Sequence, residues 1–307
     1  MACDVEAEEL YKEYPSGVIA VRGISFKAGR GRTCLMGPNG SGKTTTLSMI
    51  AGALRPTKGI VRVCGYDVWG DGWLTARKLI GYAPQRMPFR DRLSGFDNLV
   101  WYGLLRGLGL IEARRRARRL AEELGLEGYL GRSVASYSGG MRRRLTIAAA
   151  LMGEPEVLIL DEPSSGLDPK GREELWRVIE VVLKDLTIIY SSHMAVEAEA
   201  HSDYVYIFHQ GRIAASGTPQ DLVKKHAPKP KVLIYVGEKV PPLEVEGLKP
   251  YVVGAGVYMY SVDNPKEAIK IIADSYLARG FAVERIEIRR PGLEEVFLSV
   301  TGRKLEV

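Results

Sequence analysis

Short apolar runs, each followed by a polar or glycine-rich turn, recur along the first two thirds of the chain. Such runs predict strands, and the run at 157–160 has no polar position, as expected for a parallel strand that is buried on both faces. The predicted strands are Thr33–Met36, Val157–Leu160, Leu186–Tyr190 and Tyr204–Phe208. Residues 5–66 contain further short strands, 86–135 have a helical pattern, and 156–213 alternate between strand and helix. The pattern predicts an α/β fold.

The first apolar run leads into a helical pattern that places four side chains on one face, namely Leu47, Ile50, Ala51 and Leu54. Near the end of the alternating region, "SGTPQDLVKKH" (216–226) predicts a short helix with Thr218 as N-cap and Pro219 at the first helical position. The following "HAPKPKV" is typical of a linker. We therefore expect a large domain at 1–226, with a helical subdomain at about 86–150, and a small α/β domain at 227–307.

The small domain has its own pattern of strands and helices. Strands are expected at 231–237, 256–262 and 281–289, and helices at 264–280 and 291–302. No catalytic constellation is visible in it. We favour an appendage that packs on the large domain or helps it to dimerise, and the alternative is a regulatory or substrate-linked domain.

Composition is that of an ordinary globular protein, with 46% apolar and 26% charged residues among 307. No apolar run approaches the roughly 20 residues of a membrane-spanning helix, and the acidic "MACDVEAEEL" predicts no secretory signal. Cys3, Cys34 and Cys64 are far apart and odd in number, so we predict no disulfide framework, no zinc site and a reducing cytoplasm. Cys34, inside an apolar run, is expected in the core.

The net charge of +6 comes largely from two arginine-rich segments, "EARRRARRL" (112–120) and "MRRRL" (141–145). Such segments are compatible with nucleic acid or an anionic membrane surface. For 112–120 we favour a solvated helix face, because Ala113, Ala117 and Leu120 recur at helical spacing. For the second segment, 141–145, two roles stay open. It forms either a solvated helix face or support for a contact made by the preceding residues 138–140.

The clearest chemistry lies in "GPNGSGKTT" (37–45), between a predicted strand and a predicted helix. The spacing fits G-x-x-x-x-G-K-[ST], the phosphate-binding loop. Glycines at 37, 40 and 42 let successive N–H groups point at phosphate oxygens, and the helix N-terminus favours negative charge. Lys43 is expected to reach the β- and γ-phosphates, Thr44 to bind Mg²⁺, and Thr45 to touch a phosphate.

Two further strands end in polar side chains. Asp161 and Glu162 follow 157–160, and we expect Asp161 to hold Mg²⁺ through water and Glu162 to polarise the attacking water. His193 follows 186–190, at the strand end where open α/β sheets bind ligands. The other histidines lie in no such context and stay unassigned.

Together, these motifs and their order resemble the ATP-binding cassette of ABC transporters. The matching segments are the phosphate loop, "IGYAPQ" (80–85), "YSGGM" (137–141), "VLILDE" (157–162), "SGLD" (165–168), "SSH" (191–193) and, upstream, "LYKEYPSG" (10–17). The resemblance covers about residues 1–226 and is greatest to the multidrug and antibiotic-resistance export ATPases, which are encoded apart from their permease.

The resemblance implies a P-loop NTPase fold, with a RecA-like core, an antiparallel β-subdomain and an α-helical subdomain. It implies catalytic roles for Glu162, His193 and Gln85, and metal binding by Thr44, Gln85 and Asp161. ATP is expected to contact Tyr14, Gly37, Asn39, Gly40, Ser41, Gly42, Lys43, Thr44, Thr45, Ser138, Gly139, Gly140 and Asp168.

The resemblance further implies that two copies close head to tail around two ATP molecules with Mg²⁺, each ATP lying between one phosphate loop and the partner's signature. This movement would drive a separate transmembrane permease from the cytoplasmic face of the cell membrane, for export of a drug-like or lipid-like substrate. Nucleic acid is not an expected partner.

Three positions depart from the family pattern: Tyr137 and Met141 in the signature, and Ser164 after the second Walker motif. Phosphate contact depends on the signature serine, the glycine backbone and the helix start, so we expect these changes to be tolerated. Two alternatives stay open. One is a soluble nucleic-acid- or ribosome-associated ATPase that uses the arginine clusters, and the other is a regulatory protein that senses ATP without hydrolysing it.

Overall fold

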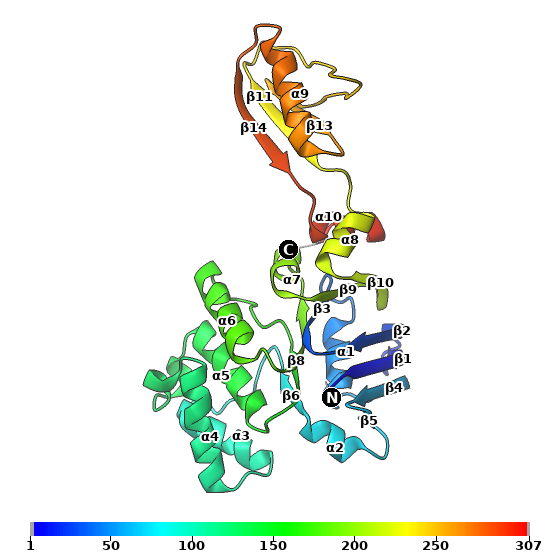
Figure 1. Cartoon of the computed structure of the whole chain (residues 1–307). Coiled ribbons are helices and arrows are strands. Elements are labelled where there is room, and N and C mark those ends of the chain that lie inside the picture. The colour runs from blue at the N-terminus through cyan, green and yellow to red at the C-terminus, as the bar shows by residue number, and fades with distance from the viewer. Residues whose placement is uncertain (1–2, 306–307) are drawn as a thin grey trace. The chain divides into compact units, whose positions relative to one another are not determined.

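The computed structural model describes residues 3–305, which divide into two compact units. One unit runs through Gln220 and includes Leu305, and the other spans Asp221–Lys304 (Figure 1). Within the described residues, no helix is both long enough and apolar enough to cross a membrane.

The first unit is built on a six-stranded sheet with the order β10-β9-β3-β8-β7-β6. Its strands are β3 (Gly31–Met36), β6 (Ile80–Ala83), β7 (Val157–Leu160), β8 (Thr187–Ser192), β9 (Tyr204–His209) and β10 (Arg212–Gly217). All neighbours in the sheet are parallel except β9 and β10, which form an antiparallel hairpin. The carboxyl ends of β3, β6, β7 and β8 therefore meet at one edge, where α/β sheets bind ligands.

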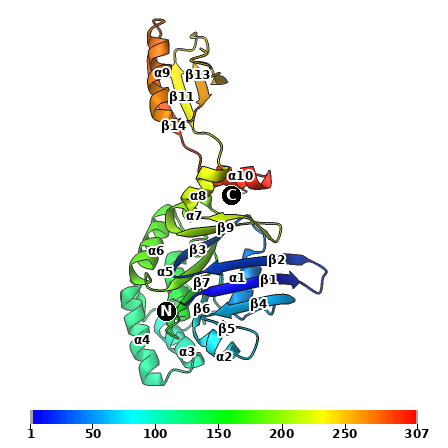
Figure 2. The same cartoon turned by 45° about the vertical axis from the view of Figure 1, so that its right-hand side comes forward.

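A smaller antiparallel sheet lies beside the first, with the order β2-β1-β4-β5. It comprises β1 (Val5–Glu13), β2 (Ile19–Ala28), β4 (Lys58–Val63) and β5 (Tyr66–Asp67). Helix α1 (Lys43–Ile50) packs between the two sheets, against β8 on one side and β1, β2 and β4 on the other (Figure 2). Its buried Leu47, Met49 and Ile50 join one hydrophobic core with residues of both sheets.

Helices surround the remaining edges of this unit. They are α2 (Trp73–Lys78), α3 (Gly95–Leu105), α4 (Leu110–Glu123), α5 (Gly139–Leu151), α6 (Pro169–Val182) and α7 (Ala195–His201), with short 3₁₀ turns at Glu127–Tyr129 and Val134–Ser136. Two sequence-based expectations were too long. Helix α1 ends at Ile50, because Gly52 takes a left-handed φ of +70°, and the helical pattern at 86–135 becomes helix only from Gly95, after the N-cap Ser94.

The second unit holds a four-stranded antiparallel sheet with the order β12-β13-β11-β14. Its elements are β11 (Lys231–Val236), β12 (Tyr251–Gly254), β13 (Val257–Ser261), α9 (Pro265–Leu277), β14 (Val283–Arg289) and α10 (Leu293–Thr301), and α8 (Pro219–His226) precedes them. Helix α9, expected at 264–280, buries Ala268, Ile272 and Tyr276 against the sheet. Strand β12 was not predicted, since its short run Tyr251–Gly254 is exposed throughout.

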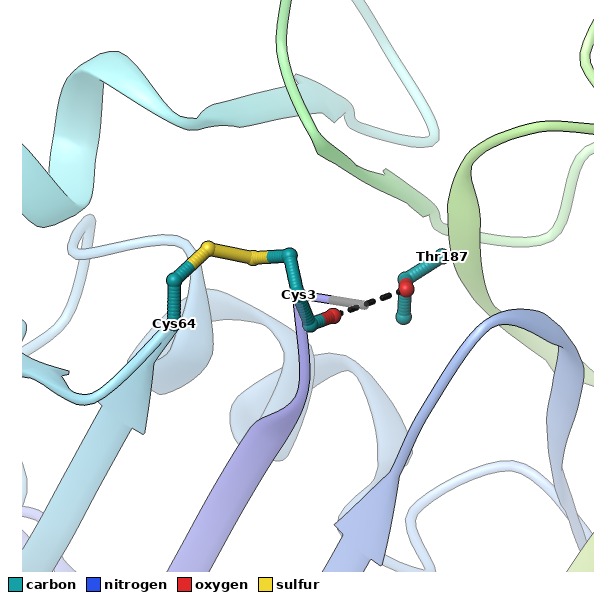
Figure 3. Close-up of a disulfide and its surroundings, with 3 residues drawn as sticks. All are labelled: Cys3, Cys64 and Thr187. Carbon is teal, nitrogen blue, oxygen red and sulfur yellow. Dashed lines mark hydrogen bonds between the residues drawn. A yellow bond between two sulfur atoms is a disulfide. The ribbon is translucent and has the colours of Figure 1, made fainter. Parts of the chain in front are cut away.

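The prediction of no disulfide was wrong, because Cys3 and Cys64 are bonded (Figure 3). Strands β1 and β4 pair with Val5 opposite Val63, which brings the start of β1 against the turn after β4. The two Cα atoms are 4.5 Å apart, within the range that a disulfide requires. Cys34 is the odd, unpaired thiol and is buried in β3, as predicted. Cysteine usage therefore gives no support for a reducing compartment.

We expect Cys64→Ser to lower the melting temperature of the oxidised protein by roughly 10 °C. The disulfide closes a loop with a sequence separation of 61, and the loop entropy of the unfolded chain makes this worth about 4 kcal/mol. Calorimetry with and without a reductant provides the internal control, since reduction should lower the wild-type value to that of Cys64→Ser and leave the variant unchanged. A variant that melts with the oxidised wild type would contradict the prediction.

Candidate active site

The loop between β3 and α1 is pressed against neighbouring backbone. A Cβ atom on Gly37 would lie 2.3 Å from Phe208 O, and one on Gly42, at φ +104°, would lie 2.5 Å from Ala20 O. The loop is also anchored by Gly37 N–H, which donates to Ser192 O at 3.1 Å. Only glycine fits at positions 37 and 42, so close backbone contacts fix these two glycines of the loop. Asn39 and Gly40 lie exposed at its tip.

Lys43 lies folded within this loop and is only 4% exposed. Its Nζ donates to Gly37 O at 2.6 Å and to Pro38 O at 2.9 Å. Burial lowers the pKa of Lys43, and the carboxylates of Glu162 and Asp161 oppose that shift. The ammonium group can therefore exchange two carbonyl acceptors for more strongly accepting anionic oxygens.

A second buried group in the loop fits an anion. In the part of the chain that the structure describes, the Ser41 hydroxyl has no hydrogen-bond partner, although Ser41 is only 3% exposed. A buried hydroxyl normally finds an acceptor, so the loop is shaped for one that the protein itself does not provide.

The metal-binding candidates meet between β3 and β7. Thr44 Oγ1 donates to Asp161 Oδ1 at 3.0 Å, and the Ser191 hydroxyl donates to the same carboxylate oxygen at 2.7 Å. Asp161 is 2% exposed. Two hydroxyl groups therefore fix a buried carboxylate beside the phosphate loop, and the sequence had not identified Ser191.

Glu162 has an uncommon backbone conformation, with φ +47° in the left-handed region. Its N–H donates to the Ser191 hydroxyl at 2.9 Å, and its carbonyl oxygen accepts from the Arg143 guanidinium. Its side-chain Oε1 lies 3.3 Å from Nδ1 of His193. The backbone thus turns this carboxylate toward the histidine predicted to act with it.

Tyr14 also lies near the phosphate loop. Its hydroxyl is 3.3 Å from Thr45 Oγ1, and the Lys12 ammonium lies 5.6 Å from the centre of its ring. The half-buried ring is therefore placed beside the start of α1, next to the residues that would hold phosphates.

The predicted signature segment begins α5. Ser138 is the N-cap and accepts from Met141 N–H at 3.3 Å, and both Ser138 and Gly139 are exposed. Tyr137 is buried, and its hydroxyl donates to Tyr129 O at 2.9 Å, so the departure from the family pattern faces inward. Among the described residues, no hydrogen bond joins Ser138–Gly140 to the phosphate loop of the same chain.

Asp168 caps a different helix, α6, where its side chain accepts from Gly171 N–H at 2.7 Å. The preceding Leu167 lies near the signature, since a Cβ on Gly139 would be 3.6 Å from its Cδ2. The structure therefore brings Lys43, Thr44, Asp161, Glu162 and His193 together, and places Ser138–Gly140 and Asp168 in a second group.

Sequence reasoning missed two further buried charges. Glu197 is 4% exposed and accepts from Trp176 Nε1 at 2.7 Å and from the hydroxyls of Ser164 and Ser192. This carboxylate connects the segments that follow β7 and β8. In the sequence, Glu197 stands four residues after His193, between two predicted strands.

The other missed charge is Arg143, in the run that the sequence left open. Arg142 pairs with Asp91, and Arg144 pairs with Glu174 at 3.2 Å, so both lie partly in solvent. Arg143 is 8% exposed, and within residues 3–305 its hydrogen bonds go to backbone carbonyls, those of Pro84, Gln85, Asp161 and Glu162. Gln85 therefore joins the site through its backbone.

The arginine-rich helix α4 has the solvated face that was favoured from its spacing, except that Arg116 is buried. Arg116 is buried and donates to Met152 O at 2.9 Å, and its guanidinium also pairs with Glu112 and Glu154. Arg115 pairs with Glu112, and Arg119 with Glu154 and Glu123. Acidic partners therefore neutralise much of the charge of this segment.

Comparison with known protein families identifies one match. A family model described as "ABC transporter" matches residues 21–165. The linearmycin resistance ATP-binding protein LnrL of Bacillus subtilis is 33% identical, over 98% of this chain and 99% of that protein. The daunorubicin/doxorubicin resistance ATP-binding protein DrrA of Streptomyces peucetius is 33% identical, over 97% and 92%. The Nod factor export ATP-binding protein I of a Rhizobium species is 34% identical, over 94% of each chain.

Solved structures match the first unit. An ATP-binding subunit of an ABC transporter superposes with a TM-score of 0.63 at 31% identity, over 72% of this chain and 92% of that one. CbiO1 from Clostridium perfringens gives a TM-score of 0.64 at 28% identity, over 72% and 90%. These matches confirm the predicted α/β P-loop fold.

Proposed function

The chain belongs to the ATP-binding subunits of ABC transporters, which hydrolyse ATP, and from this premise we propose that it drives a separate permease for the export of a drug-like or lipid-like substrate. Residues 1–226 would act as the cassette and 227–307 as an accessory domain. The observation that carries the proposal is the cluster at the carboxyl ends of β3, β7 and β8, where Lys43, Thr44, Asp161, Glu162 and His193 lie within reach of one ligand.

In this proposal each group of the cluster has one task. The loop N–H groups and Lys43 bind the phosphates, and the Ser41 hydroxyl gains the acceptor that it lacks among the described residues. Glu162 orients the attacking water and accepts its proton, and His193 holds the Glu162 carboxylate and the γ-phosphate in line. Tyr14 stacks on the base, beside Thr45.

Mg²⁺ fits the donor set at Thr44 and Asp161. No group of three His, Cys, Asp or Glu side chains able to cage a metal is found in residues 3–305. Mg²⁺ commonly uses one or two protein ligands together with phosphate oxygens and water, and a hydroxyl beside one carboxylate suits that pattern. The side chain of Gln85 would complete the set. When bound, the ion neutralises charge that develops on the phosphates.

The second group, Ser138–Gly140 and Asp168, would serve the ATP of another copy. The exposed helix start of α5 offers a γ-phosphate backbone N–H groups that have no partner within the helix, together with a favourable dipole. In the described chain this helix start shares no hydrogen bond with its own phosphate loop. A head-to-tail dimer would bring it the ATP bound by the other copy. Each ATP would then lie between Lys43 of one copy and Ser138 of the other.

The face of α3 and α4 suits a permease at the cytoplasmic side of the membrane. It exposes the apolar side chains Trp101, Leu104, Leu105, Leu110 and Ile111. Beside them lies a cavity of about 410 Å³, lined by Tyr82, Met87, Tyr102 and Arg106 among others. Exposed apolar patches of this kind bind protein partners, and Met87 lies two residues from Gln85 in the chain. The paired arginines of α4 give no comparable support for nucleic acid as the partner.

The export role is tested by expressing the chain with a candidate membrane permease subunit and measuring ATP hydrolysis by the purified complex. Relatives are named for resistance to daunorubicin and linearmycin, so these compounds are the first probes. We expect a several-fold increase of kcat with a transported compound and no increase with Glu162→Gln. The role would be contradicted if no tested compound changed the rate of ATP hydrolysis by the complex while nucleic acid stimulated hydrolysis by the isolated chain.

A further inference from the structure

A single buried guanidinium joins three parts of the site. Arg143 Nη1 lies 3.1 Å from Pro84 O and 3.3 Å from Gln85 O, at the end of β6. Its Nη2 lies 3.2 Å from Asp161 O and also donates to Glu162 O, at the end of β7. Arg143 itself belongs to α5, one turn after the signature.

The strand ends need this bridge. Strands β6 and β7 are paired up to Ala83 and Leu160, and Asp161 N–H still donates to Ala83 O. Beyond that point Pro84 has no N–H to continue the ladder. Four carbonyl oxygens converge there: Glu162 O also accepts from Ser165 N–H at 3.2 Å, and among the described residues no backbone donor reaches the other three. The planar guanidinium of arginine can donate hydrogen bonds to the carbonyl oxygens of both strand ends at once. The ammonium of a lysine carries all its donors on a single nitrogen.

Arg143 also fixes the unusual backbone of Glu162. A non-glycine residue at φ +47° is strained and persists only when its surroundings hold it. Ser191 binds the N–H of Glu162, and Arg143 binds its C=O, so both sides of the residue are held. Together with Ser165 N–H, which also donates to Glu162 O at 3.2 Å, these contacts hold the backbone from which the carboxylate projects.

A cavity of about 520 Å³ lies beside the bridge, lined by Gln85, Gly139, Arg143 and Leu167 among others. Arg142, the residue before Arg143, also pairs with Asp91 in the segment after β6. Helix α5 also packs into the core through a buried apolar face that includes Leu145 and Ile147. Arg143 is therefore a hydrogen-bonded link from α5 to the ends of both β6 and β7.

We propose that Arg143 is a positioning residue that sets the Glu162 carboxylate and couples it to the signature of the same chain. The inference rests on the proposed ATPase mechanism. In the head-to-tail dimer, the signature contacts the ATP of the partner copy while Glu162 acts on the chain's own ATP. Arg143 thus links the two ATP sites of the dimer, so that occupancy of one adjusts the catalytic carboxylate of the other.

The test uses the full chain with Arg143→Lys and Arg143→Gln. We expect kcat to fall by about tenfold in the first and about 50-fold in the second, since small misplacements of catalytic groups have effects of this size. The dissociation constant for ATP should stay within about twofold, because the phosphate loop is untouched. The Hill coefficient for ATP should fall toward 1. Arg143→Lys with wild-type kcat and Hill coefficient would overturn the proposal.

Arg116→Gln is the matched control for loss of a buried arginine. Arg116 is 7% exposed against 8% for Arg143, and it also donates to a backbone carbonyl, that of Met152. Both glutamine variants are expected to lower the melting temperature, but only Arg143→Gln should change kcat. If Arg116→Gln lowers kcat equally, the effect of Arg143 is one of stability, and the proposal fails.

Single-turnover hydrolysis in the Glu162→Gln background separates positioning from general structure. If Arg143 acts by setting Glu162, Arg143→Gln should not lower the hydrolysis rate further once the Glu162 carboxylate is gone. If Arg143 acts independently, the fold-losses of the two substitutions should multiply. An additional loss equal to that in the wild-type background would overturn the positioning role. Failure of the ATPase mechanism itself is distinguishable, because it would appear as unchanged hydrolysis in Glu162→Gln.

Discussion

Replacing Glu162 by glutamine is expected to lower ATP turnover by a factor of about a thousand, the size of effect that loss of a general base has. The amide has the shape of the carboxylate and can still meet His193 Nδ1, which lies 3.3 Å from Glu162 Oε1, but it cannot accept a proton from water. The phosphate loop keeps all its contacts, so ATP binding should persist. The variant is therefore expected to accumulate as an ATP-bound dimer, because hydrolysis is the step that opens it.

The measurement is size-exclusion chromatography with light scattering, with and without ATP, alongside steady-state hydrolysis. Gly139→Asp in the same background should keep the chain monomeric, because its charge would face the partner's γ-phosphate. A Cβ at Gly139 meets only Leu167 Cδ2 at 3.6 Å, so the fold accommodates the side chain. Gly131→Asp is the matched control, since a Cβ there meets nothing within 4 Å, and it should still dimerise.

Two results would contradict this prediction separately. Hydrolysis by Glu162→Gln at the wild-type rate would place the base elsewhere. A variant that binds ATP, does not hydrolyse it and remains monomeric would leave Glu162 in its role and remove the head-to-tail dimer.

The sequence predicted the catalytic strands well because burial on both faces leaves a strong signal. Strand β7 matches the expected Val157–Leu160 at both ends, and it delivers Asp161 and Glu162 to the sheet edge. The phosphate loop was predicted equally well, because steric contacts require its glycines. A side chain at Gly37, for example, would collide with the backbone oxygen Phe208 O. Local rules were sufficient in both cases.

What the sequence could not supply depends on contacts between distant segments. Three consecutive arginines look alike in the sequence, and only the packing of α5 against β6 and β7 turns Arg143 inward. The disulfide required the pairing of β1 with β4, which no local pattern specifies. Strand β12 has no buried face, so alternation could not reveal it.

Lys43→Ala is expected to weaken ATP binding by about 50-fold, since hydrogen bonds to charged groups contribute about 2–3 kcal/mol and each 1.4 kcal/mol is tenfold. Lys43 is 4% exposed, so its charge acts in a partly desolvated site, where it attracts phosphate more strongly than at the surface. Isothermal titration calorimetry gives the affinity. Lys58→Ala is the control, because that ammonium lies over the Tyr11 ring, which has no proposed role in binding ATP.

The pH dependence of binding identifies Lys43 as the source of the effect. Burial lowers the pKa of Lys43 in the free protein, and bound phosphates raise it again by favouring the charged form. ATP affinity should therefore decline as alkaline pH deprotonates the free lysine, with uptake of a proton on binding, and Lys43→Ala should lack both features. Equal alkaline slopes in the wild type and Lys43→Ala would assign the titration to another group. An affinity unchanged by Lys43→Ala would remove the lysine from the phosphate site altogether.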